Sequence, residues 1–128
     1  MILRIDAAWL LDIQIAVSPP NTPIRDWGAL DFLVRRHAFQ RFHGEPYYEE
    51  TEARAATFVH TAVMLQPFMD YNATIGLACA RAYMEQSGEP VSAADKDMIQ
   101  LIHDLREQHL DLAGAARVLR QWKQSPQG

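Results

Sequence analysis

Apolar residues recur at helical spacing through almost the entire 128-residue chain, whereas strand-like alternation is nearly absent. Proline, glycine and helix-capping residues interrupt this pattern and divide it into separate segments. Amphipathic helices of this kind bury their apolar stripes against one another. We therefore predict an all-α fold, in which residues 1–128 form a single compact domain of about six helices.

The predicted helices follow from apolar spacing and from the residues that begin or end them. The third helix carries a broad apolar stripe, so we expect it at the centre of the bundle. Thr51 is a candidate N-cap for that helix, and Ser92 with Asp95 resembles a capping box for the fifth. The first four predicted helices are residues 7–17, capped by Asp6; 26 or 27 to 42; 52–65; and 72 to the stop at Gly88. The fifth lies beyond Asp95, and the sixth begins after Asp111. An irregular connection is predicted at 44–50 and a frayed tail at 123–128.

Composition and charge argue against several classes of protein. The chain is 48% hydrophobic with a net charge of −4, which is typical of a globular protein and not of a disordered one. Its basic residues are mostly scattered, so we do not expect nucleic-acid binding. The one cysteine, Cys79, excludes an internal disulfide and suits a reducing cytoplasm. The apolar stretch 7–17 is too short to span a bilayer and lacks signal-peptide flanks, so neither membrane insertion nor secretion is expected.

The turn at residues 66–72, Gln-Pro-Phe-Met-Asp-Tyr-Asn, joins two apolar helices and gathers amide and carboxylate groups. It has a structural interpretation: Pro67 ends one helix, Phe68 fills the core, and Asp70 or Asn72 caps the next helix. It also has a functional one, because a helix that begins after the turn offers unpaired amides and a partial positive charge to an anion. The residues alone leave both interpretations open.

Four residues of this turn, Pro67, Phe68, Asp70 and Asn72, match without a gap the motif His-Pro-Phe-x-Asp-Gly-Asn-Lys-Arg. The chain thus resembles the Doc-like branch of the Fic/Doc family, and the order of its helices is similar over residues 29–122. The resemblance implies a bacterial cytoplasmic protein that transfers a nucleotide-derived group to a protein hydroxyl. Most members transfer AMP, whereas Doc phosphorylates elongation factor Tu and is the toxin of a toxin–antitoxin pair. A small antitoxin or a protein target would then be the partner.

The resemblance also implies roles for individual residues. Asp70 would be the metal ligand, for magnesium, and Asn72 would belong to the phosphate loop with Tyr71 beside it. ATP would be the nucleotide if the family chemistry is retained. Gln66 stands at the position of the catalytic histidine, which is the general base.

Several positions depart from the family motif. Gln66 cannot act as a base near neutral pH, because an amide does not accept a proton there. Ala73 and Thr74 replace the basic pair that neutralises phosphate, and Tyr71 replaces a glycine that lets phosphate approach the backbone. We therefore expect the transfer reaction to be weak or lost.

His60 is the remaining candidate catalytic residue. It lies six residues before Gln66, nearly two helical turns away, and so cannot simply occupy the base position. A lone histidine on an apolar stripe is more often a hydrogen-bonded core residue, and we favour that interpretation. The other histidines lack helical spacing relative to one another, so no zinc site is predicted; they are His37, His43, His103 and His109.

Three functions remain open. The first is a Doc-like toxin component with a degenerate motif. The second is a repurposed enzyme that uses Gln66, Asp70, Tyr71 and His60 on a small organic molecule. The third is a non-catalytic helical module that binds a partner.

Overall fold

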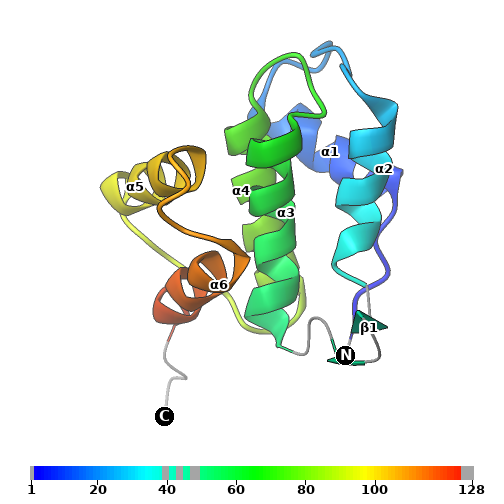
Figure 1. Ribbon diagram of the computed structural model, residues 1–128. Coiled ribbons are helices and arrows are strands. Elements are labelled where there is room, and N and C mark those ends of the chain that lie inside the picture. The colour runs from blue at the N-terminus through cyan, green and yellow to red at the C-terminus, as the bar shows by residue number, and fades with distance from the viewer. Residues whose placement is uncertain (1, 39–40, 43–44, 47–49, 125–128) are drawn as a thin grey trace.

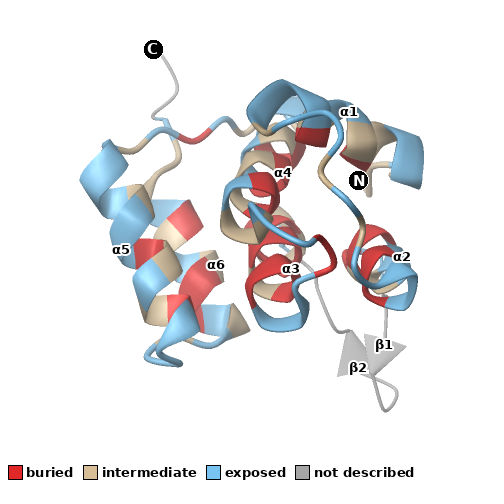
Figure 2. Ribbon diagram, turned by 90° about the horizontal axis from the view of Figure 1, so that it is seen from above, coloured by how far each residue is buried: buried red, intermediate tan, exposed pale blue. Residues whose placement is uncertain are grey.

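The computed structural model describes residues 2–38, 41–42, 45–46 and 50–124, and it confirms the all-α fold. Its helices are α1 (Ala7–Val17), α2 (Trp27–Arg36), α3 (Thr51–Leu65), α4 (Asn72–Gln86), α5 (Asp95–Arg106) and α6 (Leu112–Gln121). As predicted, α3 is central: it packs against α2, α4, α5 and α6, while α1 packs on α4 and α2 (Figure 1). Seen from above, the buried residues gather where α3 and α4 face their neighbours (Figure 2).

Three helices begin at an aspartate whose side chain accepts a hydrogen bond from the first turn. Such a cap satisfies an amide that has no partner within the helix. The cap at Asp6 confirms the predicted start of α1. The bonds are Trp9 N–H to Asp6 Oδ1 (2.9 Å), Ala29 N–H to Asp26 Oδ1 (3.0 Å) and Gly114 N–H to Asp111 Oδ1 (2.8 Å).

The predicted caps of α3 and α5 are wrong. The N-cap of α3 is Glu50, and that of α5 is Ala94; neither makes a side-chain capping bond. Thr51 is already the first residue of α3. Ser92 does not cap α5; its backbone N–H instead donates to the carbonyl of Trp122 (2.8 Å).

The second helix ends at Arg36 and does not reach residue 42 as predicted. The guanidinium of Arg54 donates to the carbonyl of His37 (3.0 Å), which would otherwise accept a bond from residue 41 in a longer helix. Strand β1 (Arg41–Phe42) replaces the predicted end of that helix, and it pairs in antiparallel fashion with β2 (Glu45–Pro46), which lies within the predicted connection. Residues 39–40, 43–44 and 47–49, His43 among them, lie outside the described part of the chain.

His37 is a buried side chain that follows α2. Its Nε2 lies 3.0 Å from the carbonyl of Leu3, and its ring stacks on Phe58 at a centroid distance of 5.2 Å. Burial lowers the pKa of this imidazole, so the neutral form is favoured. Cys79 is also buried, and burial raises the pKa of its thiol to about 12. The thiol is therefore protonated, as expected for a plain core cysteine.

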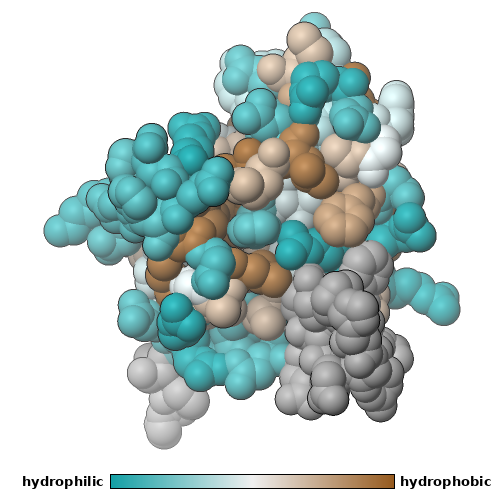
Figure 3. Space-filling view, viewed as in Figure 1, coloured by the Kyte–Doolittle hydropathy of each residue, from teal (hydrophilic) through white to brown (hydrophobic). Residues whose placement is uncertain are grey.

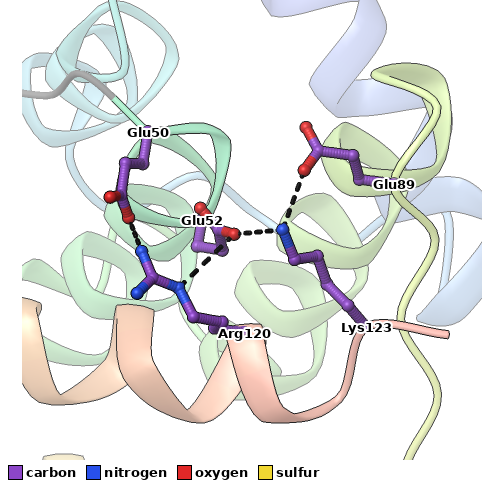
Figure 4. A network of polar contacts seen from close by, with 5 residues as sticks. All are labelled: Glu50, Glu52, Glu89, Arg120 and Lys123. Carbon is purple, nitrogen blue, oxygen red and sulfur yellow. Dashed lines mark hydrogen bonds and ion pairs between the residues drawn. The ribbon is translucent and has the colours of Figure 1, made fainter. Parts of the chain in front are cut away.

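The predicted frayed tail is wrong for residues 123 and 124. The N–H of Gln124 donates to the carbonyl of Pro90 (3.0 Å), and Lys123 forms an isolated β-bridge with Val91. Lys123 also joins a network of ion pairs that links α6 to the start of α3 (Figure 4). The end of α6 is thus fastened to two distant segments, while residues 125–128 lie outside the described range.

Apolar surface crosses the middle of one face of the molecule and is bordered by polar side chains (Figure 3). The exposed large apolar residues include Ile99, which is 69% exposed, and Met69, which is 61% exposed. Among the described helices, none combines the length and the apolar character needed to cross a membrane.

Candidate functional site

The turn between α3 and α4 is closed by the side chain of Asn72. Its Oδ1 accepts the N–H of Phe68, and its Nδ2 donates to the carbonyl of the same residue, both at 2.9 Å. Phe68 itself is buried, so these bonds fix the turn on the core. Two residues of the turn adopt left-handed backbone conformations, Gln66 with φ 48° and Tyr71 with φ 64°.

The predicted caps at this turn are also wrong. Tyr71 is the N-cap of α4, and it makes no side-chain capping bond. Asn72 is the first residue of the helix, and its amide is used to close the turn. Asp70 Oδ1 accepts the N–H of Tyr71 (2.8 Å), which is the N-cap residue and not a residue of the helix. Within the described residues, the first amides of α4 therefore have neither an intrahelical partner nor a side-chain cap.

The connection between α1 and α2 packs on the turn and occupies several of its backbone groups. Ile24 and Phe68 form an antiparallel bridge, and the guanidinium of Arg25 binds carbonyls at the C-terminus of α3. Sequence reasoning missed this support, because the connection precedes the turn by about forty positions and carries no recognisable motif. The hydrogen bonds are Arg25 N–H and Asp26 N–H to Pro67 O (2.7 and 3.1 Å), Met69 N–H to Pro23 O (2.9 Å), Arg25 Nε to Gln66 O (2.8 Å) and Arg25 Nη2 to Leu65 O (2.6 Å).

A polar pocket of about 430 Å³ lies at the N-terminus of α4. It brings together four of the five predicted site residues, Gln66, Asp70, Tyr71 and Asn72. The fifth, His60, does not line it. The remaining lining residues are Val63, Met69, Ala73, Thr74 and Arg106.

Arg106 is a basic residue of this pocket that sequence reasoning missed. It is the last residue of α5, and only the packing of α5 beside the turn brings it to Asp70 and Gln66 in one pocket. A basic residue at a helix C-terminus is an ordinary feature of sequences, so nothing local marks it as functional. Arg81, which lies further along α4, lines a neighbouring groove and not this pocket.

The pocket has the features of an anion site with one carboxylate. Unpaired amides at the start of α4 and the helix dipole favour negative charge, and Arg106 adds a full positive charge. Asp70 is exposed, and only its Oδ1 is bonded to Tyr71, so its second oxygen can reach a cation. Mg²⁺ is commonly held by one or two carboxylates, waters and substrate phosphates. The donors present therefore suit a magnesium-bound phosphate.

His60 is held elsewhere in the molecule. Its Nδ1 accepts from the guanidinium of Arg36 at 3.0 Å, and the same nitrogen of Arg36 donates to Thr61 Oγ1 at 3.0 Å. Because a guanidinium can only donate, the His60 ring is neutral in this arrangement. Burial lowers its pKa, as does the adjacent Arg36, although Asp111 opposes them. This geometry supports the interpretation of His60 as a hydrogen-bonded structural residue.

An apolar groove of about 560 Å³ adjoins the polar pocket between α4 and α5. The two cavities share Ala73, Thr74 and Arg106. The side chains of Leu77, Ile99 and others make the groove largely apolar, and it is of a size that commonly holds a small organic molecule. The site is therefore a polar pocket with an apolar extension.

Replacing Asn72 with alanine is expected to destabilise the protein by roughly 1–3 kcal/mol, because it leaves the N–H and the carbonyl of buried Phe68 without their partners. Urea unfolding followed by circular dichroism measures the loss. Asn72→Asp is the matched control: it keeps the acceptor and lacks the donor, so an intermediate loss is expected. An alanine variant as stable as the natural chain would show that these bonds do not hold the turn.

A scan of the sequence against models of protein families gave no match, and a search of curated proteins gave none either. The resemblance to the Fic/Doc family therefore stays a prediction.

Proposed function

We propose that this chain is a Doc-like component of a bacterial toxin–antitoxin pair that acts in the cytoplasm. Its motif pocket binds a magnesium-bound nucleotide weakly, and transfer to a protein hydroxyl is weak or lost. The proposal rests on the polar pocket at the N-terminus of α4, which is lined by Gln66, Asp70, Asn72 and Arg106. A small antitoxin is the partner that this proposal implies.

Binding is supported by the charges of the pocket. Asp70 would hold the magnesium ion, while the first amides of α4 and the guanidinium of Arg106 would receive phosphate oxygens. A bound nucleotide would supply the phosphoryl or nucleotidyl group. Tyr71, which is exposed at the rim in a left-handed conformation, takes up space that a glycine would leave open, so we expect weak binding.

Loss of transfer is supported by the lack of a base. Gln66 lines the pocket, but its amide cannot take a proton from a target hydroxyl near neutral pH. No histidine is among the residues that line the pocket in the described part of the chain. Removal of a positioned base typically slows such a reaction by about 10²–10⁴-fold.

The test is a calorimetric titration of the protein with ATP and with GTP, each with and without magnesium. Weak, magnesium-dependent binding is expected, and it should disappear in Asp70→Ala because the only carboxylate lining the pocket within the described residues is gone. Asp97→Asn, an exposed substitution near the start of α5, is the control and should bind as the natural chain does. No binding, or binding that survives Asp70→Ala, would refute the proposal.

A second readout separates binding from transfer. With radiolabelled ATP and elongation factor Tu as the acceptor, the natural chain should label the acceptor very slowly or not at all. Gln66→His restores the base that the family motif carries, and labelling should then rise by about 10²–10⁴-fold. Fast labelling by the natural chain would contradict the loss of transfer.

The apolar groove favours a second candidate, a repurposed site for a small organic molecule without phosphate. The groove offers about 560 Å³ of largely apolar space directly beside the polar groups of the pocket. Such a combination of apolar walls and a few polar groups is typical of small-molecule sites. The test is NMR spectroscopy with an apolar carboxylic acid as the probe. Changes in the resonances of groove residues on adding this acid, with no response to nucleotides, would favour this candidate over the first.

A further inference from the structure

The chain turns between the end of α5 and the start of α6 (Figure 1). Two histidines and an aspartate lie close together there. Each of His103, Asp104 and His109 offers a ligand atom, and these atoms all lie within 4.8 Å of one another. The two imidazole rings have a centroid distance of 6.2 Å, and His109 Nδ1 lies 3.8 Å from Asp104 Oδ1. The cluster lies outside the motif pocket.

We propose that His103, Asp104 and His109 bind a divalent transition metal ion of the zinc class. Two imidazoles and one carboxylate are ligands that suit Zn²⁺, whereas Mg²⁺ and Ca²⁺ prefer sets made of oxygen alone. Tetrahedral zinc with bonds of about 2.0–2.1 Å requires ligand atoms about 3–3.5 Å apart. The rings of His103 and His109 are exposed, so small rotations can close the present spacing.

The backbone prearranges these ligands. Gln108 has a left-handed conformation with φ 59°, which reverses the chain after α5. The N–H of His109 then donates to the carbonyl of Asp104 (2.8 Å), and this bond brings the two side chains to the same end of the helix. His109 lies six positions after His103, a spacing that would not pair them on a continuous helix. The reversal at Gln108 accounts for their meeting.

A neighbouring side chain orients the carboxylate. Gln100 Nε2 donates to Asp104 Oδ1 at 2.8 Å, so the carboxylate is held in a defined orientation. Hydrogen bonds of this kind fix the ligand and commonly raise metal affinity by about 10–100-fold. Three protein ligands leave a fourth position for water, as in open zinc sites. Because His103 also lines the apolar groove, the ion would lie at the edge of that groove.

The test is a calorimetric titration of the full-length, metal-free protein with ZnCl₂ near neutral pH. Saturable binding of a single ion per chain is expected, with a rise in melting temperature, since an ion that binds only the folded state stabilises it. His103→Ala and His109→Ala should each weaken binding by tenfold or more. Asp97→Asn removes a carboxylate from the same helix outside the cluster and should leave binding unchanged.

A double variant, His103→Ala with His109→Ala, keeps the other three histidines of the chain. Circular dichroism without metal should show the same helicity and melting temperature as the natural chain, because both side chains are exposed. Loss of zinc binding in this folded variant supports the proposal. No binding by the natural chain, or equal binding by the double variant, would overturn it, and neither outcome depends on nucleotide binding at the motif pocket.

Discussion

Gly76→Ala is expected to destabilise the protein by roughly 1–3 kcal/mol, because α3 and α4 approach too closely at this point for a side chain. An added Cβ would lie 2.5 Å from the Cβ of Ala62 and 3.1 Å from the carbonyl oxygen of Phe58. The alanine Cβ and the α3 backbone cannot rotate away, so the two helices must move apart. Urea unfolding followed by far-UV circular dichroism measures the change in the free energy of unfolding.

Gly114→Ala is the matched control for this prediction. The added Cβ would meet Leu110 Cδ2 at 2.6 Å, but this atom is the far end of a flexible, half-buried side chain that can move. Alanine also has a higher helix propensity than glycine by up to about 1 kcal/mol. A change near zero or a small gain in stability is therefore expected. An equal loss in both variants would show that the close approach at Gly76 is not the cause.

The sequence predicted those parts of the fold that depend on neighbouring residues. The bounds of α1 agree because both its cap, Asp6, and the prolines after Ser18 act locally. The bounds of α3 agree to within one residue for the same reason, since Pro67 follows its last turn. Errors arose where a distant group decided the outcome. The clearest case is α2, which ends when Arg54 takes the carbonyl of His37.

In the candidate site, too, the residues that are close in sequence were predicted, and those brought in by distant packing were not. Gln66, Asp70 and Asn72 are close in sequence, and a single turn brings them into one pocket as predicted. Arg106 enters that pocket only through the packing of α5, which no local pattern encodes. The proximity of His103 to His109 was missed for a different reason. It depends on the left-handed backbone conformation of Gln108, and residues other than glycine seldom adopt that conformation.

The contacts of the turn give a structural reason for two of the residues on which the resemblance to the Fic/Doc motif rests. Phe68 fills the core, and Asn72 closes the turn on it, so both residues stabilise the fold independently of any ligand. The side chains of Gln66 and Thr74 are exposed at the pocket and have no such structural bond in the described part of the chain. Stability alone thus accounts for Phe68 and Asn72, whether or not the turn binds a ligand.

Lys123→Met is expected to destabilise the protein by about 2 kcal/mol, because it leaves a buried carboxylate without its nearest cation. The side chain of Glu52 is only 5% exposed, and its Oε1 lies 2.5 Å from Lys123 Nζ (Figure 4). Breaking a fully buried pair costs about 3–5 kcal/mol. We expect less here, since Lys123 is 32% exposed and Arg120 Nε stays 3.7 Å from the carboxylate. Urea unfolding measures this loss as well.

Two further variants identify the source of that loss. Arg35→Met removes the ion pair with Asp31 on the surface of α2, where both side chains are more than half exposed, and it should cost less than about 1 kcal/mol. In the double variant Glu52→Gln with Lys123→Met no charge is left buried, so much of the lost stability should return. If Arg35→Met and Lys123→Met cost the same, burial of the Glu52 charge does not govern the stability of this network. If only Lys123→Met is costly and the double variant recovers, the connection between α6 and the start of α3 depends on neutralising one buried carboxylate.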